Sequence, residues 1–153
     1  CLGWQFLLPM DAGDEHYIKG IRIPATDEQR DFDELVLGLT KLLIDSLNEK
    51  ELNKLIPEKD RLDIKGSISR LEKVLEVCGV EDATPHIEFL RKLQNLRSSS
   101  SAHRKSSNYH KIAKDFGVDD QSLCEVFGGI MKQALSYLDF LIAIVHGGQL
   151  KRC

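Results

Sequence analysis

Apolar residues recur at intervals of three and four along most of the chain, which is the spacing of amphipathic helices. The first two dozen residues follow a different pattern. The segments Trp4–Leu8 and Tyr17–Ile23 alternate apolar and polar positions, and Pro9 and Pro24 interrupt them. This pattern predicts a small hairpin or an extended arm over residues 1–25, with a linker to another part of a longer protein as the alternative.

Helical periodicity starts after residue 25. Thr26 and Gln29 have the spacing of a capping box, which predicts a helix start, and Asn48 and Glu51 repeat that signal for a short helix ending near Pro57. The first of these helices carries its apolar residues on one face: Phe32, Leu35, Val36, Leu39, Leu42, Leu43 and Leu47.

Two further helices follow in the middle of the chain. One is expected to end at Gly79, and the next to begin at Thr84 and Pro85, with Thr84 as the cap and Pro85 at the first helical position. The apolar face of the first holds Ile64, Ile68, Leu71, Leu75 and Cys78, and that of the second holds Ile87, Leu90, Leu93 and Leu96.

A short helix is expected around Tyr109–Phe116, closed by Gly117, before the longest one. The longest helix contains Gly128 and Gly129, which predict a kink or close packing, because glycine is unfavourable within a helix. Its expected apolar stripe comprises Leu123, Phe127, Ile130, Ala134, Leu138, Leu141 and Val145.

Four substantial helices and short connections predict an all-α fold, an antiparallel bundle of four main helices plus short helices, preceded by a short extended arm. We expect an arm or linker over 1–25, the bundle over 26–148 and a tail over 149–153. The length of 153 residues suits one domain, and no apolar run approaches the roughly 20 residues that span a bilayer.

The four cysteines are scattered, without zinc-finger spacing, so we expect no structural zinc site and a reducing, cytoplasmic compartment. These cysteines are Cys1, Cys78, Cys124 and Cys153. The chain lacks an initiator Met and signal-peptide features, which predicts a fragment of a larger parent protein.

Charge is distributed unevenly. The net charge is −3, yet the segment from residue 91 to residue 114 contains seven basic residues and no acidic one. We call this segment the basic island: Arg91, Lys92, Arg97, Arg104, Lys105, Lys111 and Lys114. A basic island in an acidic protein can attract a polyanion locally, whereas a solvated helix face followed by a basic loop is the alternative.

The basic island contains the residues best suited to chemistry, Arg97 and His103, separated by five small residues. Histidine exchanges protons near neutral pH, and arginine stabilises charge that develops on phosphate oxygens. Six residues of regular helix leave the two side chains about 120° apart, so their convergence requires unwinding or bending within Ser98–Ala102.

An Arg followed after four to six residues by His, at the end of a bundle helix after a Leu-rich stretch, resembles the HEPN superfamily. The resemblance covers roughly Asp27 to His146. It implies an all-α dimer and a metal-independent RNase of a prokaryotic defence or toxin system, with two motifs meeting in one composite site. It also implies that Arg97 and His103 are the catalytic pair. The position after the Arg, usually Asn, Asp or His in active members, is Ser98, which we assign to the catalytic motif as a polar substitute.

We expect four further residues to bind RNA: Arg104, Lys105, His110 and Lys111. The partners expected are RNA, a second copy of the chain and the rest of the parent protein, without DNA or membrane. No cofactor and no metal are expected, because no cluster of Asp, Glu, His and Cys has metal-ligand spacing. Two other functions stay open: a non-catalytic helical dimerisation or interaction module, and a nucleotide-sensing domain.

Overall fold

The computed structural model describes residues 2–101, 114–116 and 121–150, without the side chains of residues 99–101. Within these ranges the regular structure is helical and no strand occurs, which confirms the prediction of an all-α fold. Outside the helices, the backbone at Leu7 forms an isolated antiparallel β-bridge with Leu47.

Helix α2 (Gln29–Thr40) continues directly into a π-helical turn, η1 (Lys41–Asp45). The predicted capping box is wrong. Glu28 occupies the position before the helix without a side-chain cap, and the Gln29 amide donates to Asp33 at 2.8 Å. Burial, rather than a cap, holds this helix, because most of the predicted apolar face lies in the core: Phe32, Leu35, Val36, Leu39, Leu43 and Leu47.

Helix α3 (Glu49–Leu55) begins as predicted, since the Asn48 side chain accepts a hydrogen bond from the Glu51 backbone N–H at 3.2 Å. A short α4 (Glu58–Arg61) follows, which the periodicity did not predict. Helix α5 (Ser67–Val77) starts after Ile64 and ends before Gly79, where the backbone turns with φ +65°. Glycine adopts this left-handed conformation without strain, so the predicted stop is confirmed.

Helix α6 (Thr84–Ser101) places all four predicted apolar residues, from Ile87 to Leu96, in the core. Its start differs from the prediction by one residue. The Ala83 carbonyl accepts from the backbone N–H groups of His86 and Ile87, both at 3.1 Å, so Ala83 rather than Thr84 takes the cap position.

Helix α8 (Leu123–His146) begins with Ser122, whose hydroxyl accepts from the Glu125 backbone N–H at 3.2 Å. The buried stripe is rotated from the predicted one, so that Leu138 and Val145 are only half-buried. Its members are Val126, Phe127, Ile130, Ala134, Tyr137, Leu141 and Ile144. Among the described residues the expected close packing at Gly128 and Gly129 is not found, because a Cβ at either position would meet none of them within 4 Å.

By length and composition α8 could cross a membrane, which corrects the expectation that no stretch is long and apolar enough. Its most apolar 18-residue window has a mean hydropathy of 1.3, and only 28% of that window is buried in the protein. A core helix of a globular protein passes the same test, but most of such a helix is buried. The low burial shows that the part of the chain that the structure describes leaves much of the surface of α8 uncovered.

The N-terminal residues pack on the helices instead of forming a hairpin. Leu8 donates to the Ser46 carbonyl at 2.7 Å, the Asn48 backbone N–H donates to the Phe6 carbonyl at 3.0 Å, and Phe6 is buried. The expected extended conformation of Tyr17–Ile23 is wrong, because α1 (Glu15–Gly20) is helical. Gly38 lets α1 approach α2 closely, because a Cβ at this position would lie 3.4 Å from the Tyr17 carbonyl oxygen.

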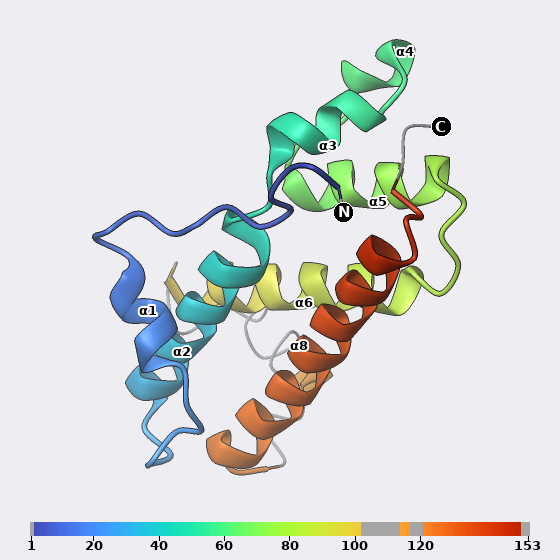
Figure 1. Ribbon diagram of the computed structural model, residues 1–153. Helices are drawn as coiled ribbons and strands as arrows, with labels where there is room; N and C mark the ends of the chain where they lie inside the picture. The colour runs from blue at the N-terminus through green and yellow to red at the C-terminus, as the bar shows by residue number, and fades with distance from the viewer. Residues whose placement is uncertain (1, 102–113, 117–120, 151–153) are drawn as a thin grey trace.

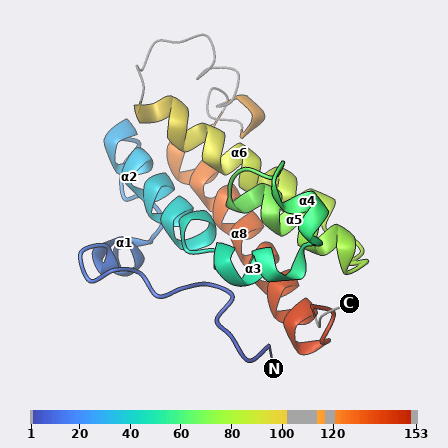
Figure 2. The ribbon, with the colours of Figure 1, turned by 90° about the horizontal axis from the view of Figure 1, so that it is seen from above.

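Helix α6 is central to the packing of the main helices. It contacts α2, η1, α5 and α8, and it crosses α2 and α8 obliquely (Figure 1). Viewed from above, α2, α6 and α8 lie side by side (Figure 2). The end of α6 that carries Arg97 thereby lies beside η1, and this places the candidate site.

Candidate functional site

Arg97 lies in the last turns of α6, next to the buried Leu96. Its Nη1 donates to both carboxylate oxygens of Asp45, at 2.9 and 3.2 Å. The two side chains are 34% and 42% exposed, so the pair lies at the surface with one side against the protein. A charge-assisted hydrogen bond of this kind fixes the direction of a guanidinium group.

Asp45 is held in place by η1. In a π-helical turn the hydrogen bonds join residues five apart, and the turn is wider than an α-helical one. Residues four or five apart therefore lie on nearly the same side, which brings Lys41 and Asp45 to one face. Lys41 donates to Asp14 at 2.6 Å and lies 5.1 Å from the centre of the Tyr17 ring. The hydrogen bond to Asp14 raises the pKa of Lys41 above its ordinary value.

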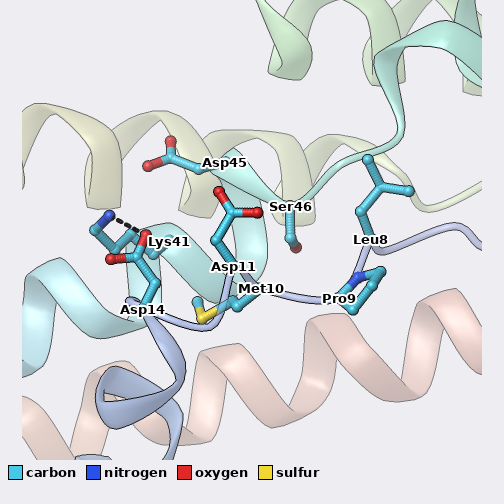
Figure 3. Close-up of a pocket in the computed structure, with 8 residues that line it drawn as sticks. All are labelled: Leu8, Pro9, Met10, Asp11, Asp14, Lys41, Asp45 and Ser46. Atoms are coloured by element: carbon cyan, nitrogen blue, oxygen red, sulfur yellow. Dashed lines mark hydrogen bonds and ion pairs between the residues drawn. The ribbon is translucent and has the colours of Figure 1, made fainter.

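A cavity of about 260 Å³ opens between this face and the N-terminal segment (Figure 3). Its wall is apolar along residues 8–10 and polar where Asp11, Asp14 and the residues of η1 contribute. The lining residues are Leu8, Pro9, Met10, Asp11, Asp14, Lys41, Asp45 and Ser46. Asp45 therefore both lines the cavity and holds Arg97. The volume is close to the lower end of ordinary ligand pockets, which suits one small polar group.

Carboxylates in the cavity do not amount to a metal centre. Within the part of the chain that the structure describes, no three side chains of His, Cys, Asp or Glu lie where they could hold one ion together. Asp14 is engaged by Lys41 and Asp45 by Arg97, so two of the three carboxylates that line the cavity have cationic partners.

Ser98 is exposed on α6, and its hydroxyl donates to the Gln94 carbonyl at 2.9 Å. This hydrogen bond to the preceding turn is common for serine within helices. The helix remains regular as far as Ser101, so the unwinding expected within Ser98–Ala102 does not occur over Ser98–Ser101.

Five of the predicted site residues lie outside the described residues, within 102–113. They are His103, Arg104, Lys105, His110 and Lys111. Of the predicted catalytic residues, the structure thus places Arg97 and Ser98, at successive positions of one helix.

The two arginines of the basic island that the structure describes form ion pairs with acidic side chains of the same chain. Arg91 forms an ion pair with Glu72 of α5, as Arg97 does with Asp45. Both arginines therefore join α6 to a neighbouring helix, and acidic partners offset their charge. Lys92 is exposed on the same helix.

Sequence reasoning missed Asp45 and Lys41. Both are polar residues in an amphipathic helix, where charged side chains are expected on the outer face. Nothing in the local pattern indicates a π-helical turn or links Asp45 to an arginine 52 positions away. Only the packing of η1 against α6 brings them together.

Comparisons with known proteins add no relative. No protein-family model matches the chain, and neither a curated protein nor a solved structure resembles it significantly. The resemblance to the HEPN superfamily therefore stays a prediction that depends on the Arg97–His103 spacing.

Proposed function

We propose that the chain is a metal-independent endoribonuclease of HEPN type that acts in the cytoplasm as a homodimer. One observation carries the proposal: Arg97 lies half-exposed near the end of α6, with its guanidinium oriented by Asp45, which also lines a cavity. Such an arginine is suited to hold a phosphate, and His103 follows it by six positions.

The proposed reaction is attack of a ribose 2′-OH on the adjacent phosphate. His103 accepts the 2′-OH proton while the new O–P bond forms, and the bond from phosphorus to the 5′-oxygen breaks. A proton returned to that oxygen yields a free 5′-OH, and the other product ends in a 2′,3′-cyclic phosphate. Arg97 stabilises the charge on the phosphate oxygens, and Ser98 assists in holding the phosphate.

DNA lacks the nucleophile of this reaction, so RNA is the substrate class. Phosphate contacts from Arg104, Lys105, His110 and Lys111 would position the strand without reading its sequence. Binding should therefore weaken steeply with salt, and replacing Arg104 and Lys105 with Ala should lower the affinity for all RNA sequences alike. Equal affinity at low and high salt would contradict an electrostatic footprint.

The deciding experiment compares two arginines of α6. Arg97→Ala and His103→Ala should each abolish cleavage of a labelled RNA in EDTA, whereas Arg91→Ala should retain it. Arg91 is the matched control, because it also lies on α6 and also pairs with a carboxylate of a neighbouring helix. Mass spectrometry of the products should show the 2′,3′-cyclic phosphate end, and a DNA strand of the same sequence should stay intact.

Two outcomes would overturn the proposal. Cleavage that survives Arg97→Ala or His103→Ala would place the chemistry elsewhere, and cleavage lost with EDTA would make it metal-dependent. Circular dichroism of each variant separates loss of chemistry from loss of fold.

A non-catalytic interaction module is the second candidate, and the uncovered surface of α8 favours it. In that case the Arg97–Asp45 pair only joins α6 to η1. Arg97→Ala and Arg91→Ala would then change stability to a similar degree, and no RNA would be cut by any variant.

A further inference from the structure

The outer side of α8 carries exposed apolar residues that none of the other described helices covers. Leu135 and Ile142 are each 56% exposed there, seven residues apart and therefore on the same side of the helix. Met131, Leu138 and Val145 lie half-buried along one edge of this face. Exposed apolar patches that are contiguous mark interaction surfaces more often than isolated leucines do.

Gly128 belongs to the same side of α8, because it lies seven residues before Leu135. Glycine weakens a helix interior, and no described residue requires a glycine here, because a Cβ at Gly128 would meet none of them within 4 Å. The missing side chain leaves a depression in the helix surface. A side chain from outside the chain could fill it.

A line of four ionisable residues runs along this side of α8, beside Leu135 and Ile142: Glu125, Lys132, Asp139 and His146. They recur every seven residues, so they lie on one side of α8, and all four are exposed. Neighbours in the line are about 10 Å apart along the axis, too far to pair with each other. None of the ion pairs among the described residues involves them.

Read in opposite directions, the line of charges places an acidic residue opposite a basic one at every position. When two such helices run antiparallel about a two-fold axis near Leu135 and Ser136, Lys132 meets Asp139 of the second copy. In the same register Glu125 meets His146 of the second copy. Each pairing occurs twice by symmetry. A parallel arrangement would instead place Lys132 against Lys132 and Asp139 against Asp139.

The apolar residues fit the same register. Ile142 comes level with Gly128 of the second copy, which lies fourteen residues before it and therefore on the same side of the helix, so a large side chain meets the depression. The two Leu135 side chains lie near the axis. From this combination we propose that α8 is a self-association surface, on which two copies of the chain pack antiparallel through Lys132, Leu135, Asp139 and Ile142.

A second copy fits this face better than a lipid bilayer does. Insertion of α8 into a membrane would bury the line of charges in hydrocarbon, where ionisable side chains are costly. An isologous dimer pairs the same charges at its rim and buries the leucine and isoleucine. The proposal does not depend on RNA cleavage, so failure of the catalytic experiment leaves it standing.

The test is a charge swap followed by sedimentation equilibrium at high micromolar concentration. The unaltered chain should be a dimer. Lys132→Asp and Asp139→Lys alone should each raise the dimer Kd about tenfold or more, because like charges then face each other. The double variant should bring the Kd back close to the original value. Lys50→Asp, at an exposed position of α3, is the matched control and should leave the Kd unchanged.

Several results would overturn the proposal. A monomeric unaltered chain would do so. If that monomer also floated with phosphatidylcholine vesicles in a density gradient, lipid would be the occupant of this face. A dimer insensitive to both single variants would place the interface elsewhere. A double variant as weak as the single ones would contradict the antiparallel pairing. Circular dichroism checks that all variants remain folded.

Discussion

Asp45 and Arg97 lie 52 positions apart in the chain, yet both Asp45 oxygens accept hydrogen bonds from Nη1 of Arg97. The pair links η1 to α6 at the edge of the cavity that Asp45 also lines. Asp45 thereby connects the polar face of η1 to the residue that the proposed chemistry requires. Its contribution to stability and its contribution to function can be separated experimentally.

Asp45→Asn should reduce RNA cleavage much more than it reduces stability. The pair is partly exposed, so its loss should lower the free energy of unfolding by no more than about 1 kcal/mol. The guanidinium would lose its ionic partner and its fixed direction, which the transition state requires. Urea unfolding and cleavage rates measure the two effects. An unchanged rate would show that Asp45 does not position Arg97 for catalysis.

Tyr137→Phe should stabilise the protein. Among the buried side chains described, the Tyr137 hydroxyl has no hydrogen-bond partner, and the residue is fully buried. An unsatisfied buried polar group costs about 1–3 kcal/mol, so removing it should raise the free energy of unfolding by about 1 kcal/mol. Thermal unfolding at neutral pH tests this, with the less buried Tyr17→Phe as the control. A clear loss of stability in the Tyr137 variant would mean that the hydroxyl is satisfied.

Alkaline pH should act on the same residue. Burial raises the pKa of Tyr137 far above its ordinary value of 10.0. Above pH 10 the unfolded chain loses the phenolic proton while the folded chain keeps it, so stability falls as pH rises. The slope due to this residue is about 1.4 kcal/mol per pH unit. Urea unfolding between pH 9 and pH 11 should therefore show a shallower decline for Tyr137→Phe than for the unaltered chain.

His86 should lower stability at mildly acidic pH. It stacks on Phe140 with ring centroids 4.3 Å apart, and burial lowers its pKa below the ordinary value of 6.5. The unfolded chain therefore takes up the proton first as pH falls through 6.5, and the stability contributed by the neutral ring is lost. An NMR titration should place the His86 pKa below 6.5. His86→Leu should make the unfolding midpoint less sensitive to pH between 7 and 5.

Gly128→Ala should strengthen the helix and weaken the dimer. The added methyl group meets none of the described residues within 4 Å, so the folded monomer should gain about 0.5–1 kcal/mol. The same methyl group would partly fill the depression that receives Ile142 of the second copy, so the dimer Kd should rise. Unfolding at low protein concentration and sedimentation at high concentration measure the two effects. A tighter dimer would show that the depression is not used.

Local signals in the sequence predicted much of the helical structure. Asn48 caps α3, Gly79 ends α5, and the apolar residues of α6 are buried, because each of these outcomes depends on neighbours within a turn or two. The prediction of an extended conformation for Tyr17–Ile23 was wrong because this short segment depends on distant contacts. It packs against Gly38 of α2, and such packing decides the conformation of a short segment.

The candidate site depended on both the sequence and the tertiary structure. The types and spacing of Arg97, Ser98 and His103 are properties of the sequence, and they suggested phosphodiester chemistry without any structure. Asp45 orients Arg97, and η1 brings Lys41 and Asp45 to one face, only because of tertiary packing. The same is true of Gly128, near which no described residue lies within 4 Å of a Cβ position. Local spacing decides which side of a helix a residue occupies. Only the folded arrangement decides what lies opposite that side, because contacts between helices join residues far apart in the chain.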